Sequence, residues 1–407
     1  MMVIILIICL NKKSNGETAL KIVDIREISV PIKSTLRNSI FDFSEMTTSI
    51  VAIKTDVIRD GKPVMGYAFN STGRYACGDT MRKRLIPRVL KADPDSLLNA
   101  AGDNFDPAKV LACMMIREKP GGHTERSVPI GTIEVALWDA VAKIEGLPLY
   151  ASLANRFNEG KIPTKVPCYV GGGWYAPGKG IPELLDEIKS RQDEGYNMMK
   201  IKVGGAPLQE DIARLEAAIK AMGSANSLAV DANAAWNREN SLKYAKALAP
   251  YGLRWMEEPT DPLDYALLDE LTGFYNSPIA TGENLFSTQD INNLILFGKL
   301  RSDRDIIQID VPQSYGIVQF SRTLEMIKSR GWGRHSVFPH GGNQMTLAIV
   351  AGFGLGGCEA YPGVFGIFAG FADDAVLENG SINLSDRPGI GFEGQQELYK
   401  VMQSIFE

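Results

Sequence analysis

The sequence predicts an α/β protein in which a barrel of parallel strands follows a smaller α+β region. Between Val166 and Glu359, about eight short apolar stretches alternate with amphipathic stretches of helical length. Strands that alternate with helices pair in parallel, and parallel strands covered on both faces are continuously apolar, as these stretches are. Three acids, Asp231, Glu257 and Glu283, each end one stretch, at equal intervals of 26 residues. These observations predict a TIM-type barrel without its last helix, (β/α)7β.

The residues before the barrel predict a capping domain that contains both strands and helices. The predicted elements are a strand, a hairpin and two helices, over residues 20–32, 49–70, 82–101 and 130–154. Asp60-Gly61 marks the turn of the hairpin because this pair favours the tight turns that join antiparallel strands. We therefore expect an α+β cap over residues 20–160 and the barrel over residues 161–380.

The barrel contains one strand with an unusual pair of charges. Residues 198–203 predict a strand, and side chains two residues apart in a strand point to the same face, so Lys200 and Lys202 share a face. Apolar residues at spacings of three and four predict a helix over residues 208–222, ended near Gly223. Further helices are predicted over residues 241–248, 262–271, 288–297 and 317–330.

Composition favours a function with small molecules. The 407 residues carry 43 basic and 48 acidic side chains, a net charge of −5, which provides no broad basic surface for nucleic acid or for anionic membranes. The five cysteines are widely spaced and form no CxxC pair, so the sequence predicts neither a zinc knuckle nor a disulfide framework. A reducing compartment, the cytoplasm, is expected.

Residues 1–19 are expected to be a dispensable extension. The apolar run Val3–Leu10 is similar to the core of an export signal, but no basic residue precedes it and Lys12 and Lys13 follow it. The run is also shorter than the roughly 20 residues that span a bilayer.

The three acids at strand ends predict a metal site. Asp231, Glu257 and Glu283 would converge from neighbouring strands, where three carboxylates repel one another unless a cation lies between them. Oxygen ligands select a hard ion, and Mg²⁺ needs few protein ligands because it keeps water and substrate oxygens. One acid at such a position commonly caps the next helix instead, but three in phase favour one bound Mg²⁺ per subunit.

The lysine pair and a histidine predict acid–base chemistry. Lys200 beside Lys202 is expected to lower the pKa of the ammonium of Lys202, which suits a base near neutral pH. His340 follows a later strand, and Asp310, one strand-helix unit earlier, is placed to fix its tautomer. A base and an acid on opposite sides of a chelated carboxylate would remove an α-proton and then either return it or expel a β-hydroxyl.

At these residues the sequence resembles the enolase superfamily, in its mandelate racemase-like branch, whose sites use a Lys or His base with Mg²⁺. The motifs KIK, VDAN, WMEEP and TGEN carry the resemblance, which spans residues 20–407 and implies that residues 381–407 return to the cap. It implies Mg²⁺ ligation by the three acids, Lys202 as the base with Lys200 beside it, and His340 paired with Asp310. An even-numbered homo-oligomer is also implied.

Within that branch, HGGNQM, CEAYPGVF and DRPGIGFEG are similar to the D-tartrate dehydratases. This resemblance implies conversion of D-tartrate to oxaloacetate, with Lys202 taking the C2 proton and His340 protonating the departing C3 hydroxyl. A dehydratase or racemase of another acid sugar uses the same machinery and stays open. A binding protein without catalysis is the second alternative, and it predicts mismatched catalytic positions, which this chain does not show.

Several further residues are candidates for substrate binding. Lys119 would pair with a substrate carboxylate or remain a solvated loop residue, and Glu359 would donate or accept a hydrogen bond or pack at the rim of the core. Asn233 and Asn284 follow metal ligands and would support them. Asn38 lies in residues 35–43, the cap segment expected to close over the substrate.

Overall fold

The computed structural model describes residues 20–176 and 178–407, and the predicted extension of residues 1–19 lies outside that range. The chain begins with a three-stranded antiparallel sheet, β1 (Ile22–Pro31), β2 (Thr47–Arg59) and β3 (Lys62–Phe69), in the order β1-β2-β3. Asp60 and Gly61 form the predicted turn, with φ of 49° and 74°. Both angles lie in the left-handed region that such two-residue turns require.

The helices of the cap differ from the prediction at their ends. They are α1, α2, α3, α4 and α5, over Gly78–Thr80, Ile86–Leu90, Pro107–Met114, His123–Glu145 and Leu149–Phe157, with a π-helical turn at Met81–Leu85. The helix expected over residues 82–101 was wrong beyond Leu90, because Asp93 and Pro94 begin a separate 3-10 turn there. The long helix α4 starts seven residues before the predicted residue 130.

The barrel strands run in parallel and close into a ring. They are β4 (Lys165–Gly172), β5 (Met199–Lys202), β6 (Leu228–Asp231), β7 (Met256–Glu257), β8 (Ile279–Thr281), β9 (Ile306–Ile307) and β10 (Cys358–Ala360). Val337 fills the seventh position through a parallel bridge to Ile307, and β10 pairs with β4. The prediction of eight strand positions is confirmed.

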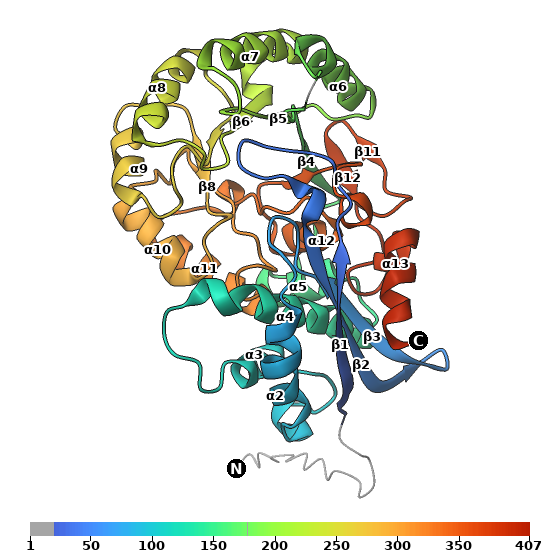
Figure 1. Ribbon diagram of the computed structural model, residues 1–407. Helices are drawn as coiled ribbons and strands as arrows, with labels where there is room; N and C mark the ends of the chain where they lie inside the picture. The colour runs from blue at the N-terminus through green and yellow to red at the C-terminus, as the bar shows by residue number, and fades with distance from the viewer. Residues whose placement is uncertain (1–19, 177) are drawn as a thin grey trace, which may run out of the picture.

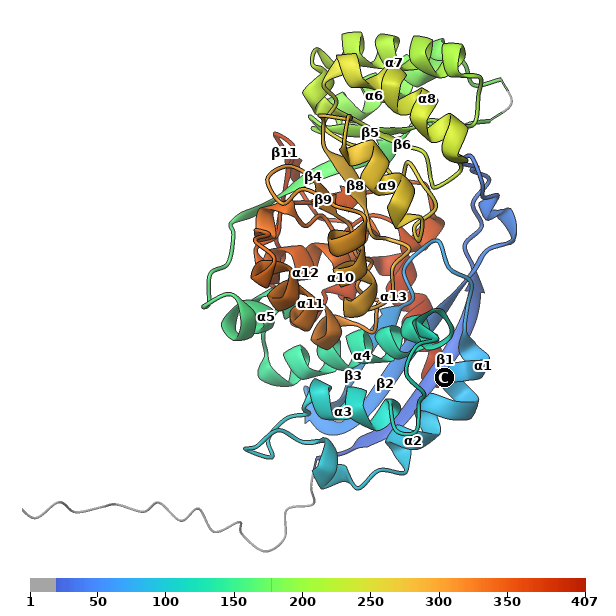
Figure 2. The same cartoon turned by 90° about the vertical axis from the view of Figure 1, so that its left-hand side faces the viewer.

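In the described chain, the seven helices α6 to α12 surround these strands, which confirms the predicted (β/α)7β arrangement (Figures 1 and 2). They are α6 (Ile181–Asp193), α7 (Leu208–Met222), α8 (Arg238–Leu248), α9 (Tyr265–Thr272), α10 (Thr288–Phe297), α11 (Ile317–Ser329) and α12 (Gln344–Phe353). The predicted helices α7 to α11 begin and end within three residues of their observed bounds. Within the described residues, no barrel helix follows β10.

The inside of the barrel is apolar at one end and charged at the other. One buried apolar layer consists of Tyr169, Ala229, Trp255, Ala280, Ile306 and Phe338. Lys200, Asp231 and Glu257 lie nearer the carboxyl ends of β5, β6 and β7, and all are less than 1% exposed. Such a layer of packed side chains supports the site that lies at the carboxyl ends of the strands.

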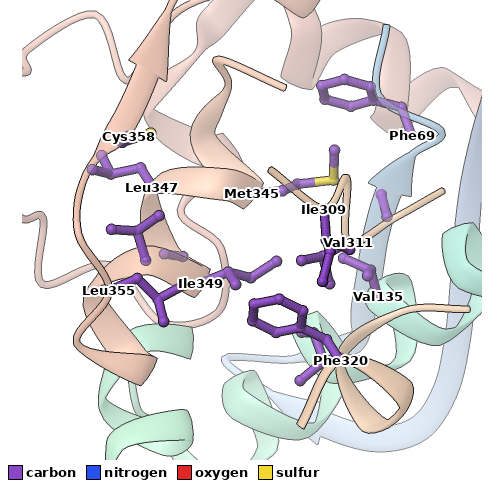
Figure 3. Packing of buried hydrophobic residues seen from close by; sticks show 14 of the residues in the cluster. Phe69, Val135, Ile309, Val311, Phe320, Met345, Leu347, Ile349, Leu355 and Cys358 are labelled. Atoms are coloured by element: carbon purple, nitrogen blue, oxygen red, sulfur yellow. The ribbon is translucent and has the colours of Figure 1, made fainter. Parts of the chain in front are cut away.

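The cap and the barrel share one hydrophobic core. Figure 3 shows Val135 of α4 beside Ile309, Val311 and Phe320 of the barrel, all of them buried. A polar contact reinforces this packing, because the carboxylate of Glu134 accepts hydrogen bonds from the first backbone N–H groups of α11.

After β10 the chain forms a small hairpin, β11 (Leu377–Glu378) with β12 (Ser381–Asn383), and then α13 (Gln396–Gln403). Its last residues lie against the cap sheet, where the guanidinium of Arg26 is 4.6 Å from the ring centre of Phe406 (Figure 1). Among the described residues, no helix is both long enough and apolar enough to span a membrane.

Candidate active site

Parallel register brings the charged residues of three strands together. Lys202 of β5 pairs with Asp231 of β6, and Asp231 pairs with Glu257 of β7. Because neighbouring parallel strands end at the same edge, these side chains meet at the mouth of the barrel. Glu283 and His340 reach the same mouth from the loops that follow β8 and the seventh strand.

The ammonium of Lys200 is enclosed by carboxylates. Its Nζ contacts Glu257 and lies 2.7 Å from Oε1 of Glu359 and 3.3 Å from Oδ2 of Asp231. Burial alone would lower the pKa of Lys200, but Glu257 and Glu359 raise it well above its ordinary value. The two lysines therefore do not face each other as uncompensated charges, contrary to what the sequence suggested.

Lys202 is two residues further along β5 than Lys200 and therefore lies closer to the mouth of the barrel. Its Nζ is 2.6 Å from Oδ2 of Asp231 and 4.6 Å from the ring centre of Trp174. Burial would raise the pKa of Asp231, but Lys202 and Lys200 hold it well below its usual range. Asn233 supports the same carboxylate through its backbone N–H, 2.8 Å from Oδ1, and its Nδ2, 3.2 Å from Oδ2.

The side chains of the consecutive acids Glu257 and Glu258 point in different directions and have different neighbours. Glu257 faces inward, and beside Lys200 its Oε2 accepts hydrogen bonds from Nε1 of Trp255 at 2.9 Å and Nε2 of Gln308 at 2.7 Å. Burial raises the pKa of Glu257 to about 8, against the pull of Lys200. Glu258 has a positive φ of 45°, lines the cavity and accepts a hydrogen bond from Asn284.

His340 is held by the predicted aspartate. Its Nδ1 is 2.8 Å from Oδ2 of Asp310, while its Nε2 lies on the other side, 3.9 Å from Oε2 of Glu283. Burial would lower the pKa of His340, but Glu283 and Asp310 raise it to about 10. The imidazole is therefore fixed in orientation and charged near neutral pH, the state of a general acid.

These side chains surround a tight cavity of about 50 Å³ between the barrel and the cap. The cap segment containing Asn38 crosses the barrel mouth, where Oγ of Ser39 donates a hydrogen bond to the carbonyl of Ala232 (Figure 2). The charged and amide residues lining the cavity are Asn38, Arg74, Lys202, Asp231, Asn233, Glu258, Glu283, Asn284, Gln313 and His340. Most of the residues singled out from the sequence are thus brought together.

Two substrate-binding expectations change. Lys119 is exposed in a cap loop and does not line the cavity, because its neighbour Glu118 is the residue held inward, 2.7 Å from Arg88. Glu359 lies beneath the cavity, where its Oε1 accepts hydrogen bonds from Lys200 and Tyr361. Glu359 is therefore a partner of Lys200 and does not line the cavity.

The donor chemistry of the barrel mouth fits a hard cation. Among the described residues, no three Asp, Glu, His or Cys side chains already converge at metal-binding geometry. The lysine ammonium groups lie among the carboxylates and compensate part of their charge. Within the described chain, Oδ1 of Asn233, Oε1 of Gln308 and Oε2 of Glu359 are buried acceptors without a donor. An excess of oxygen acceptors around acids is the environment that Mg²⁺ prefers.

Several residues that line this cavity were not predicted, among them Arg74, Trp174 and Glu258. Arg74 and Trp174 come from loops in which nothing in the local sequence pattern marks a functional residue. Glu258 had a signal, since it is the second acid of WMEEP, but a strand alternates its faces and the prediction used only the first acid.

Comparison with known proteins decides the family. Residues 183–398 match the family described as enolase C-terminal domain-like, of the mandelate racemase/muconate lactonizing type. The chain is 32% identical to L-talarate/galactarate dehydratase of Salmonella typhimurium over 357 residues, 86% of this chain and 81% of that protein. The chain belongs to the enolase superfamily.

Other members of the enolase superfamily agree with this assignment. Arabinonate dehydratase of Saccharolobus solfataricus is 28% identical, covering 80% of this chain and 85% of that protein. The crystal structure of the Salmonella typhimurium dehydratase superposes with a TM-score of 0.72 at 25% identity, covering 93% and 92% of the two chains. A racemase from Streptomyces coelicolor with bound magnesium, TM-score 0.73 and 23% identity over 93% and 99%, shows the shared fold.

These superfamily relatives are named as acid-sugar dehydratases, which are hydro-lyases, and several similar structures were solved with magnesium. Sites of the superfamily combine a Lys or His base with Mg²⁺. The residue types at this barrel mouth correspond to that combination.

Proposed function

We propose that the chain is a Mg²⁺-dependent acid-sugar dehydratase, with D-tartrate as the first substrate to test. The observation that carries the proposal is that Lys202 and the Asp310-held His340 line one cavity together with Asp231 and Glu283. Relatives named as acid-sugar dehydratases support the reaction type. The ion, held by Asp231, Glu257 and Glu283, would supply positive charge that acidifies the proton next to the substrate carboxylate.

Lys202 acts as the base in this proposal. Lys200 and Lys202 are both buried, but only Lys202 lines the cavity. Lys200 lies below the cavity, where the carboxylates of Asp231, Glu257 and Glu359 enclose its ammonium group. The neutral amine of Lys202 accepts the proton from C2, and Lys200 stays charged and holds Glu257 and Glu359 in place. Before the next turnover Lys202 must release this proton, and His340 must regain the one that it donates.

His340 acts as the acid. Nε2 of His340 donates its proton to the departing C3 hydroxyl, so that C3–O breaks and water leaves. Asp310 keeps Nδ1 occupied, which leaves Nε2 as the nitrogen that faces the substrate. From D-tartrate the enol product tautomerises to oxaloacetate, and substrate and products balance as D-tartrate giving oxaloacetate and water.

Features of the cavity support a short, hydroxylated substrate. Its volume of about 50 Å³ favours a four-carbon acid, which requires the least opening of the cap. Nε1 of Trp174 and Oδ1 of Asn233 lie on residues that line it and have no hydrogen-bond partner within the described chain. Substrate hydroxyl groups can satisfy such a donor and such an acceptor.

A racemase is the second candidate, because a base and an acid on one cavity can also remove and return a proton on opposite faces. The experiment that separates the candidates is a panel of acid sugars, including the three tartrate stereoisomers, incubated with enzyme and Mg²⁺. We expect 2-keto acid formation, with oxaloacetate from D-tartrate. Isomerisation without keto acid would replace dehydration by racemisation, and turnover of a longer acid sugar alone would change the substrate.

A further inference from the structure

Arg74 is the one cavity-lining cation outside the proposed acid–base pair within the described chain. It lies in the loop between β3 and α1, half-buried, with its guanidinium 4.9 Å from the ring centre of Phe286. Its Nη2 donates a hydrogen bond to Oδ1 of Asn284, and Nδ2 of Asn284 donates to Oε1 of Glu258 at 2.6 Å. Arg74 thus reaches from the cap to the barrel mouth.

The loop that carries Arg74 is fixed against the barrel. Nε2 of Gln313 donates to the backbone carbonyls of Asn70 at 3.3 Å and Thr72 at 2.9 Å. Ser71 holds a left-handed conformation with φ of 59°, which a residue with a side chain adopts only when its surroundings fix it. The guanidinium is therefore presented by a constrained turn rather than by a free loop.

The charges of the cavity single out this guanidinium. Lys202 is paired with Asp231 and His340 with Asp310, whereas Arg74 contacts a neutral amide and has no carboxylate within ion-pair distance in the described residues. A guanidinium offers parallel N–H donors whose geometry matches a carboxylate. In an acid sugar with carboxylates at both ends, the second carboxylate would lie away from Lys202 and would need another positive charge to neutralise it.

We propose that Arg74 binds the distal carboxylate of the substrate and makes the enzyme selective for diacids over monoacids. This inference rests on the proposed function. A diacid places one carboxylate at the catalytic acids and lysines, and its second carboxylate pairs with Arg74. A monoacid with a terminal hydroxymethyl group leaves Arg74 without that partner.

The test compares Arg74→Gln with wild type on matched substrates. D-tartrate is paired with the four-carbon acid in which a hydroxymethyl group replaces the second carboxylate, and galactarate is paired with galactonate. We expect Arg74→Gln to lower kcat/KM for the diacid about 10- to 100-fold, mainly through KM, and to change the monoacid less than threefold. Arg238→Gln is the matched control, because Arg238 is an exposed arginine of α8 that pairs with Glu270 at 2.8 Å and does not line the cavity.

Calorimetric binding of the same acids makes the test independent of turnover. If no acid is dehydrated, the proposed function fails, while weaker binding of diacids alone to Arg74→Gln still supports the role of Arg74. Equal losses for diacid and monoacid, or no loss for either, would overturn the inference even in an active dehydratase. Arg74→Lys, which keeps the charge but not the fork, should recover part of the diacid preference.

Discussion

Nδ1 of His340 lies 2.8 Å from Oδ2 of Asp310, a carboxylate that is fully buried. This contact explains how a partly enclosed imidazole keeps its proton. Glu283 and Asp310 both favour the charged ring, and they outweigh the burial that would otherwise lower its pKa.

In the metal-free protein, the pKa of His340 should therefore be about 10, and its positive charge should persist through neutral pH and be lost only as the pH rises through that value. Asp310→Asn removes one favourable charge, so the same ring should lose its proton at a lower pH. NMR titration of the three histidines measures this, with His340→Asn to assign the signal and His123 and His335 as references. An unchanged titration in Asp310→Asn would contradict the pairing.

Removal of either proposed acid–base residue should stop turnover without removing the metal. Lys202→Ala and His340→Asn should each lower kcat by at least about 100-fold, the usual contribution of a positioned acid or base. Mg²⁺ titration should give affinities close to wild type, because neither side chain is a proposed ligand. Wild-type-like turnover in either variant would exclude the two-sided mechanism.

The two consecutive acids should differ in their effect on Mg²⁺. Burial, Glu283 and Asp231 raise the pKa of Glu258 well above its usual range. Glu258 is not a proposed ligand, and its Oε1 already accepts a hydrogen bond from Asn284, so Glu258→Gln should bind Mg²⁺ almost as wild type does. Glu257→Gln removes a proposed ligand and should weaken Mg²⁺ binding at least about 10-fold. Isothermal titration calorimetry of Mg²⁺ binding to both variants tests this difference. If Glu258→Gln weakened Mg²⁺ binding more than Glu257→Gln does, the ligand would be Glu258 rather than Glu257.

Glu134 should stabilise the joint between cap and barrel in a pH-dependent manner. It accepts hydrogen bonds from the N–H groups of Ile317 at 2.7 Å and Val318 at 2.9 Å and from Nε1 of Trp138 at 2.8 Å. Glu134→Gln puts an amide group against these donors and should cost about 1–3 kcal/mol of unfolding free energy.

Burial raises the pKa of Glu134 to about 7, well above the usual pKa of a glutamate. The folded protein then binds this proton more tightly than the unfolded chain, so the residue's contribution to stability falls as pH rises from about 4.5 to 7. The difference in thermal midpoint between wild type and Glu134→Gln should accordingly be larger at pH 5 than at pH 7.5. A larger difference at pH 7.5 would contradict this sign.

The sequence predicted the barrel residues of the site because parallel strands impose a common edge. Once Lys202, Asp231 and Glu257 each end a strand of one barrel, register alone brings them together. The same rule predicted the pairing of Asp310 with His340, because these two residues follow neighbouring strands of the barrel.

The cap residues could not be predicted in this way. Arg74 reaches the cavity because Gln313, far along the chain, holds its loop, and no periodic pattern encodes that contact. Lys119 showed the opposite error, since its loop is tethered through Glu118 to Arg88 and leaves the lysine exposed. Which cap loops cover a barrel depends on tertiary packing rather than on local spacing.

The most direct test of the account is exchange of the α-proton of D-tartrate, or of the best substrate in the panel, in D₂O with Mg²⁺. His340→Asn retains the base but lacks the acid, so deuterium should enter the α-position while no keto acid forms. Lys202→Ala lacks the base and should show neither exchange nor product. Exchange that persists in Lys202→Ala, or keto acid formed by His340→Asn at the wild-type rate, would contradict the assignment of the two residues to the two sides of the substrate.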